Sequence, residues 1–190
     1  MRRLANTVVV CTSTVEDDSG RPIPMGLTLS SFTSLSIPSA SPERPAVMFN
    51  IGAPSRTLAA IERTRGFCVH ILSGDESGAA IAALFSGENK DPEGPVQRLR
   101  EMGYIVTSGD AGRPPCQWLE GPGVLYVLRC RLMQEPSRGL VRVRDHVVVL
   151  GEVLELAPQP GPGDPAKLGL IYADRQYREP GRRLGLGGLE

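Results

Sequence analysis

Short apolar runs separated by turn-forming residues set the pattern of the first half of the chain. Apolar and β-branched residues gather at residues 8–15, 26–32, 46–51 and 67–72, and the first run stops at the polar cluster 16–20. Runs of this kind, bounded by Gly, Pro, Asp or Ser, are typical of strands. We therefore expect four strands in this half.

The second half shows a clearer alternation of apolar and polar positions. Apolar residues at every second position from Val124 to Leu132 leave Arg129 and Arg131 on the opposite face. A further alternation predicts one long strand over residues 141–153, with valines on one face and with Arg142, Arg144, His146 and Glu152 on the other. Residues 136–139 predict the loop of a hairpin between these two strands.

Three segments between the strands have the spacing of short helices. They are residues 57–63, 76–86 and 95–102. Ser55 is placed to cap the first helix, and Gly103 follows the third as a helix end. The second is rich in alanine, and its larger apolar residues fall on roughly one face.

Many short strands with a few inserted helices predict a mainly β fold of the α+β class. We expect a Greek-key-like antiparallel barrel. Strands and helices do not alternate strictly, and no Gly-x-Gly-x-x-Gly follows the first strand, which argues against a parallel dinucleotide-binding sheet. The 190 residues fit one domain, which we assign to residues 1–180, with residues 181–190 as a C-terminal tail.

The charge balance narrows the class of partner. Lys+Arg and Asp+Glu are equal at 21 each, so the chain has no electrostatic footprint for nucleic acid. No apolar run approaches the roughly 20 residues of a membrane span, and no signal peptide precedes the first strand. We expect a cytoplasmic protein that binds neither nucleic acid nor membrane.

The four cysteines show no spacing suited to a metal ion. They are Cys11, Cys68, Cys116 and Cys130, and we expect no metal site. Three of them lie in apolar runs, where a thiol packs as a small hydrophobic group. For a cytoplasmic chain the reduced state is favoured over disulfides.

Two polar clusters are candidates for ligand binding. Residues 28–34, Thr-Leu-Ser-Ser-Phe-Thr-Ser, offer hydroxyls that can donate to and accept from a flavin ring or a phosphate. Residues 50–57 lie where a strand ends and a helix begins, and the free backbone N–H groups of a helix start favour an anion. Arg56 adds a guanidinium suited to phosphate. The alternatives are an ordinary half-exposed strand and a plain capped helix with Arg56 in solvent.

The histidines add one more candidate. His146 shares the polar face of its predicted strand with arginines, so it either contacts a nucleotide or forms a structural hydrogen bond. His70 lies in an apolar run, where we expect a structural role. No paired carboxylates and no Ser–His–Asp arrangement stand out.

Taken in order, these segments resemble the flavin reductase-like family, whose fold is an FMN-binding split β-barrel. The resemblance covers roughly residues 4 to 178. It is carried by residues 26–36, 49–51, 54–58, 67–73, 82–85, 145–153 and 170–172, and by Tyr177. One departure is Arg144, where the family often has Gly before the Asp-His pair. A second is the polar insertion 87–115, which we expect to form a lid or a substrate wall.

The resemblance implies a role for each candidate residue. The isoalloxazine and ribityl chain of FMN would be lined by Thr28, Leu29, Ser30 and Ser31, with Asn50 helping to hold the flavin. The phosphate would be taken by Ser55, Arg56 and Thr57. Phe85 would lie against the flavin region, and Tyr172 would close the pocket. His146, the catalytic candidate, would lie where a reduced nicotinamide or the flavin diphosphate approaches.

The function implied is an NAD(P)H:flavin oxidoreductase. NADH or NADPH would give a hydride to FMN, with FAD also possible, and the flavin would supply the chemistry. Family members are usually homodimers, and reduced flavin would pass to a monooxygenase. Two alternatives stay open: an FMN-bound oxidoreductase acting on an organic substrate, and a non-catalytic flavin-binding module.

Overall fold

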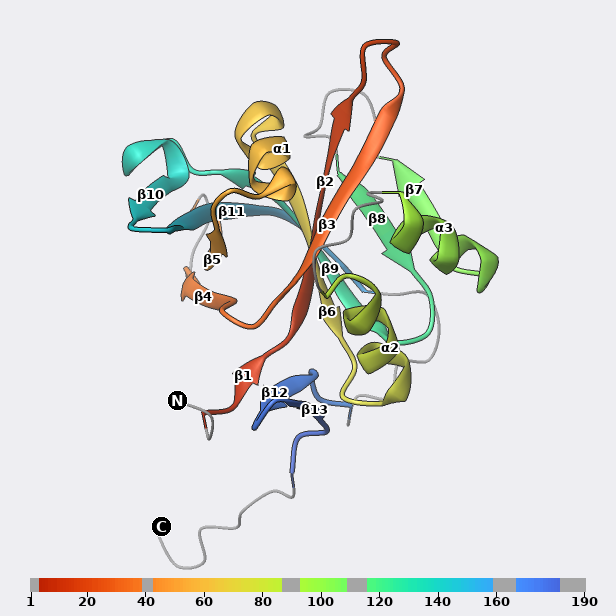
Figure 1. Cartoon of the computed structure of the whole chain (residues 1–190). Helices are drawn as coiled ribbons and strands as arrows, with labels where there is room; N and C mark the ends of the chain where they lie inside the picture. Colours follow the sequence, from red (N-terminus) through yellow and green to blue (C-terminus); the bar gives the residue numbers. More distant parts are fainter. Residues whose placement is uncertain (1–3, 39–42, 87–92, 109–115, 159–166, 182–190) are drawn as a thin grey trace, which may run out of the picture.

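The structure, a computed structural model, describes residues 4–38, 43–86, 93–108, 116–158 and 167–181 (Figure 1). The helices are α1 (Arg56–Thr64), α2 (Glu76–Leu84), α3 (Gly94–Glu101) and the 3-10 turn η1 (Ser137–Gly139). The strands are β1 (Asn6–Thr7), β2 (Val9–Glu16), β3 (Pro22–Leu29), β4 (Thr33–Ser36), β5 (Ala46–Gly52), β6 (Gly66–Leu72), β7 (Ile105–Ser108), β8 (Gln117–Glu120), β9 (Val124–Leu132), β10 (Leu140–Val143), β11 (His146–Pro158), β12 (Ile171–Ala173) and β13 (Gln176–Arg178).

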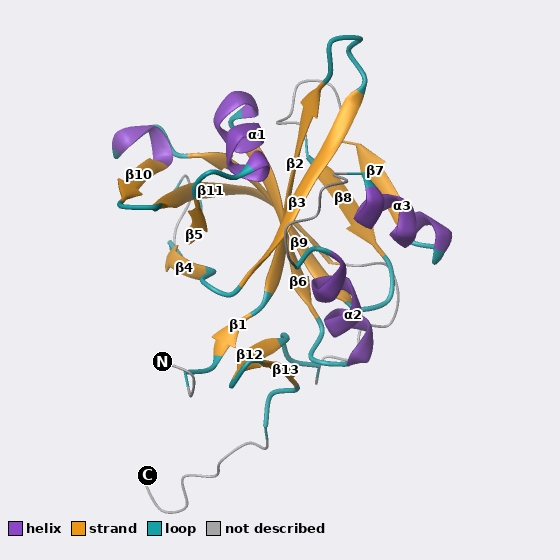
Figure 2. Ribbon diagram, viewed as in Figure 1, coloured by secondary structure: helices purple, strands orange, loops and turns teal. Residues whose placement is uncertain are grey.

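One curled antiparallel sheet organises the chain (Figure 2). Its strands follow the order β3-β2-β6-β9-β11-β5-β4, and β10 pairs with β11 beside this path. The edge strands β3 and β4 are consecutive in the chain and only residues 30–32 separate them, so the sheet must curl until its edges approach. Within the described ranges no ladder joins β3 to β4. The predicted antiparallel split barrel is confirmed.

Alternate residues of the strands enter two separate cores. Val9 of β2 packs in one cluster with Phe67 of the neighbouring strand β6 and with Phe49 of β5. Because β6, β9 and β11 separate β2 from β5 in the sheet order, this core lies inside the curl. Val8 and Val10 enter the second cluster, on the outer face. The two faces of β2 are therefore both buried, which explains its nearly continuous apolar run.

The helices are divided between the two cores. Leu58 and Ile61 of α1 belong to the inner core. Ile81 of α2 and Leu99 of α3 belong to the outer core, with Leu119 of β8. The predicted helices at residues 57–63, 76–86 and 95–102 are confirmed, with shifts of one or two residues at their ends.

The long strand predicted over residues 141–153 was wrong. The chain reverses at Arg144 and Asp145, and Val143 pairs with His146 across the β10–β11 hairpin. Arg144 has a left-handed backbone (φ 54°), which side-chain alternation does not reveal. The predicted hairpin across residues 136–139 was also wrong, because the strand that pairs with β9 is β11 and not β10.

Two further differences concern strand ends and short strands. The strand predicted over residues 26–32 runs from Pro22 to Leu29. The strands β1, β4, β7, β8, β12 and β13 were not predicted, because each has only 2 to 4 residues and shows no period.

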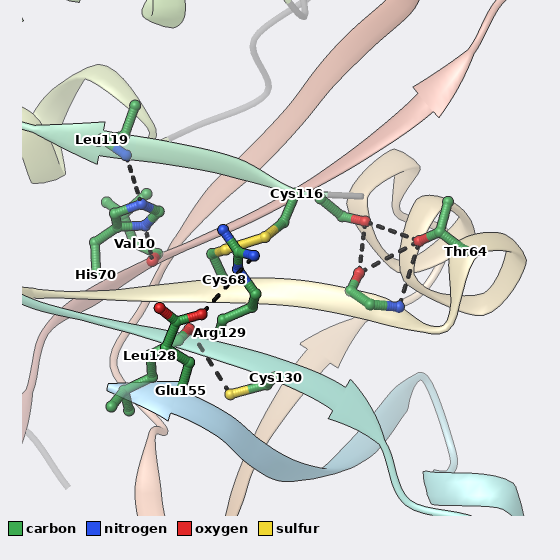
Figure 3. Close-up of a disulfide and its surroundings, with 12 residues drawn as sticks. Val10, Thr64, Cys68, His70, Cys116, Leu119, Leu128, Arg129, Cys130 and Glu155 are labelled. Atoms are coloured by element: carbon green, nitrogen blue, oxygen red, sulfur yellow. Dashed lines mark hydrogen bonds and ion pairs between the residues drawn. A yellow bond between two sulfur atoms is a disulfide. The ribbon is translucent and has the colours of Figure 1, made fainter. Parts of the chain in front are cut away.

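Cys68 of β6 and Cys116, just before β8, form a disulfide (Figure 3). The expectation of four reduced cysteines was therefore wrong for this pair. The two residues are 48 apart in sequence, so only the packing of β8 beside β6 brings them together. Cys11 and Cys130 are free and buried, as expected.

His70 is fully buried between β2 and β8. Its Nε2 accepts a hydrogen bond from the Leu119 N–H (3.1 Å), so its Nδ1 carries the proton and donates to the Val10 carbonyl (3.1 Å). Burial lowers the pKa of His70 to about 4. Both ring nitrogens are thus used in packing, which supports the expected structural role.

The insertion 87–115 is described only in its middle. Val96 and Leu99 of α3 pack into the outer core, while residues 87–92 and 109–115 lie outside the described residues, so the prediction of a lid is not tested there.

Among the described helices none is long and apolar enough to cross a membrane. The predicted tail 181–190 also lies outside the description, except for Gly181.

Candidate flavin site

The end of β3 forms the first wall of the candidate site. Thr28 is fastened to the end of α2, since its backbone N–H donates to the Phe85 carbonyl (3.1 Å) and its hydroxyl donates to the Ala82 carbonyl (2.6 Å). The hydroxyl proton is committed, so Thr28 can only accept a hydrogen bond from a ligand. Leu29 is buried and Ser30, which follows it, is exposed.

A cavity of about 700 Å³ lies against this wall. The described residues that line it are Val8, Thr28, Leu29, Ser30, Ser86, Tyr172, Arg175, Gln176 and Tyr177. Its size lies within the range of small-molecule and cofactor sites. The structure therefore brings Tyr172 to the predicted hydroxyl cluster from the other end of the chain.

The hairpin of β12 and β13 forms the second wall. Together with β1 it makes a separate sheet in the order β1-β12-β13, with Tyr172 opposite Asn6 and Tyr177 (Figure 1). The rings of Tyr172 and Tyr177 meet edge to face, with centroids 5.5 Å apart. This pair presents an aromatic surface with two phenolic hydroxyls.

Ser31 links the β3–β4 connection to β5. Its hydroxyl accepts from the Asn50 N–H (3.0 Å) and donates to the Asn50 carbonyl (3.3 Å). Asn50 is exposed, and it pairs with Val148 of β11. This contact fixes the place where the sheet edges approach, so Ser30 and the Asn50 side chain are held on neighbouring segments.

The start of α1 offers donors for an anion. Ser55 is the N-cap, with its hydroxyl accepting from the Leu58 N–H (3.3 Å). Arg56 is the first helical residue and is exposed, whereas Thr57 is buried. The first turn contains no acidic residue, so nothing there opposes a phosphate.

His146 lies beside the connection that leads into α1. It pairs with Gly52, and a Cβ on that glycine would lie 3.8 Å from the His146 Nε2. The Asp145 carbonyl accepts from the Ala53 N–H (2.8 Å). The Asp145 carboxylate accepts from Nδ1 of His146 (3.0 Å), and this hydrogen bond holds the pKa of Asp145 below its usual value. The imidazole is therefore oriented, with Nε2 beside Gly52 at the end of β5.

Phe85 supports the cavity from behind. It is buried in the outer core, and a Cβ on Gly26 would lie 2.7 Å from its ring. Phe85 is not among the described residues that line the cavity. Its predicted contact with the flavin region stays a prediction.

The predicted residues thus fall into two groups. Thr28, Leu29, Ser30 and Tyr172 line the cavity. Asn50, Ser55, Arg56, Thr57 and His146 lie around the β5–α1 connection, and Ser31 joins the groups through Asn50.

Several lining residues carry no recognisable signal in the sequence. Ser86, Arg175 and Gln176 belong to no recognisable pattern, and Val8 reads as an ordinary core residue. Tyr177 lies in a segment that resembles the family, but the resemblance implies no role for it.

Comparison with known proteins decides the family. A family model described as the flavin reductase like domain matches residues 1–181. Over 186 residues the chain is 31% identical to an NADH:riboflavin 5'-phosphate oxidoreductase of Streptomyces pristinaespiralis, with 95% of this chain and 84% of that protein covered. The chain belongs to the flavin reductase like family. This confirms the resemblance found in the sequence.

Two further proteins extend the comparison. A flavin reductase of Pseudomonas putida is 29% identical over 147 residues, which cover 77% of this chain and 71% of that protein. The solved structure of the styrene monooxygenase flavin reductase of Pseudomonas putida S12 matches with a TM-score of 0.67 at 22% identity, covering 96% of each chain. The structural match supports the fold alone.

Proposed function

We propose that this protein is an NAD(P)H:flavin reductase that uses FMN. The observation that carries the proposal is the Ser31–Asn50 contact, because it joins the segment after Ser30, which lines a cavity of flavin-compatible size, to β5, which leads to the start of α1. FMN has two chemically distinct ends, a planar ring and a phosphate. The two groups of residues match these ends in kind.

The donors and acceptors present fit such a ligand. The start of α1, with Ser55, Arg56 and Thr57, would hold the phosphate. Gly52 has no side chain, so the space beside His146 that a Cβ would occupy stays available to the ligand.

The other end of the ligand needs hydrogen bonds and an apolar wall. Thr28, Ser30, Ser31 and Asn50 would hold the ring and ribityl chain, with Leu29 as the apolar wall. Tyr172 would close the cavity, and His146 would orient the incoming nicotinamide.

A flavin held by these residues would supply the hydride acceptor for reduced nicotinamide, and that chemistry requires no side-chain acid or base. The tasks left to this chain are orientation and exclusion of water. Thr28 is held by two hydrogen bonds and His146 by one. Such fixed groups position a ligand at little cost in conformational entropy.

We also propose a homodimer and a monooxygenase partner that receives the reduced flavin. The edge strand β4 is exposed along its whole length, and Leu35 and Ile37 are 52% and 75% exposed. Exposed apolar residues on a sheet edge are suited to being covered by a second copy. The second proposal is suggested by the name of the solved protein from Pseudomonas putida S12, which is the flavin reductase of a styrene monooxygenase. The cytoplasmic location stays a prediction.

Turnover with added flavin tests the function. The purified protein is mixed with NADH or NADPH, with and without excess FMN, and loss of nicotinamide absorbance is followed. We expect oxidation that depends on FMN. A yellow protein that oxidises neither nicotinamide would indicate bound flavin serving an organic substrate. A protein that binds no flavin would contradict every flavin-based function.

A further inference from the structure

The cavity beside β3 carries one charge among its described lining residues. Arg175 is the only ionised side chain there, and no carboxylate faces it from that lining. The remaining polar lining consists of hydroxyls and one amide, from Thr28, Ser30, Ser86 and Gln176 together with the two tyrosines. A cavity with this composition favours a ligand that carries an anionic group.

Arg175 occupies a backbone position that ordinarily favours glycine. Ala173 pairs with Gln176, so Asp174 and Arg175 form the two-residue turn of the β12–β13 hairpin. Their φ angles are 52° and 62°. Turns with two positive φ angles are usually built from Asn and Gly. A residue with a long charged side chain at such a strained position is a mark of functional sites.

The hairpin holds this turn firmly. Arg178 donates from Nε to the Ala173 carbonyl (3.3 Å) and from Nη2 to the Gln176 side-chain oxygen (3.4 Å). β12 is also paired with β1. Arg175 itself is exposed and forms no hydrogen bond or ion pair with another described residue. Its donors are therefore available to a ligand.

An anion bound by Arg175 would be distinct from the flavin phosphate. The proposed phosphate residues Ser55, Arg56 and Thr57 are absent from the described lining of this cavity. We propose that Arg175 is a specificity-determining residue that binds a phosphate group of the nicotinamide dinucleotide. The inference rests on the proposed function, in which that dinucleotide approaches the ring beside Thr28 and Tyr172.

The test compares two hydride donors and two arginine variants. NADH carries phosphate, whereas 1-benzyl-1,4-dihydronicotinamide has the reacting ring without it. Arg175→Asn removes the guanidinium and keeps a residue that tolerates a left-handed backbone. The matched control is Arg138→Asn, since Arg138 is also exposed and left-handed (φ 54°) but lies in η1, away from the cavity.

We expect Arg175→Asn to raise the KM for NADH by roughly 10- to 100-fold, as for loss of a hydrogen bond to a charged group. For Arg175→Asn, the KM for the benzyl compound and the Kd for FMN should change less than about twofold. For the control Arg138→Asn, the KM for NADH should also change less than about twofold. Arg175→Lys should restore part of the NADH affinity. An equal loss for NADH and NADPH would assign the contact to the pyrophosphate alone, and a larger loss for NADPH would add a contact with the 2′-phosphate.

Three results for Arg175→Asn would overturn the inference. They are an unchanged KM for NADH, an equal rise in KM for both hydride donors, and a raised Kd for FMN with an unchanged KM for NADH. Direct binding of NADH, followed by its fluorescence without added flavin, separates this inference from the proposed function. A wild-type protein that binds NADH without oxidising it contradicts only the function. Equal NADH binding by wild type and Arg175→Asn contradicts the role of Arg175.

Discussion

The buried His70 should make the stability of the protein depend on pH. The native imidazole is neutral, with both nitrogens in hydrogen bonds and a pKa of about 4. In the unfolded chain a histidine has a pKa of about 6.5. The unfolded state therefore binds more protons between these values, and stability must fall as the pH falls through this window.

The size of the effect follows from the same two values. The contribution of His70 is fully present above about pH 6.5, and about 2 kcal/mol of it is lost by pH 5. The full loss, below about pH 4, is about 3 kcal/mol. This is a large fraction of the stability of an ordinary domain.

Urea unfolding between pH 5 and 8 measures this dependence. His70→Gln disturbs the two hydrogen bonds of the imidazole, so its free energy of unfolding at pH 7 should be lower by about 1–3 kcal/mol. Because glutamine does not titrate, this free energy should fall less steeply toward pH 5 than that of the wild type. The matched control is His146→Gln, which removes the other of the 2 histidines from an exposed position. If His70→Gln loses stability with pH as steeply as the wild type, the buried neutral imidazole is not the cause.

Three other substitutions test the candidate site. Ser55→Ala combined with Arg56→Ala should weaken FMN by roughly 10- to 100-fold and riboflavin far less, since only FMN carries a phosphate; fluorescence titration measures both. His146→Ala should slow NADH oxidation by about 10-fold with modest loss of flavin affinity, seen in steady-state kinetics. Gly26→Ala places a Cβ 2.7 Å from the Phe85 ring and should lower the free energy of unfolding by about 1–3 kcal/mol in urea titrations.

Each of these substitutions has a control and a contrary result. Arg63→Ala, in the last turn of α1, should leave the FMN affinity unchanged, and equal losses for FMN and riboflavin would mean that the phosphate lies elsewhere. An unchanged rate for His146→Ala would leave this residue with a structural role. Gly169→Ala, whose Cβ would meet neighbours at an ordinary 3.8 Å, should be nearly neutral. A Gly26→Ala variant as stable as this control would refute the close packing of Phe85.

The sequence alone revealed the fold class because local patterns carry it. The alternation in β9, the capped start of α1 and the apolar run of β2 are all visible within a few neighbouring residues. The β10–β11 reversal was missed because it depends on a left-handed arginine where glycine would have marked the turn. Side-chain alternation continues across such a turn without interruption.

The candidate site divides in the same way. Thr28 to Ser31 and Ser55 to Thr57 stand out as hydroxyl-rich segments with a helix start. The disulfide of Cys68 with Cys116 and the lining by Arg175 depend on segments far apart in the chain. No local pattern encodes such contacts, so only the assembled structure could reveal them.

One flavin site is expected to span the end of β3 and the start of α1. A crystal structure of the protein with FMN would locate both ends of the ligand. We expect the phosphate at the N–H groups of Ser55 to Thr57, and the ring between Thr28–Ser31 and Tyr172. Density for FMN with its phosphate away from α1, or with its ring outside the cavity that Thr28 and Tyr172 line, would contradict it.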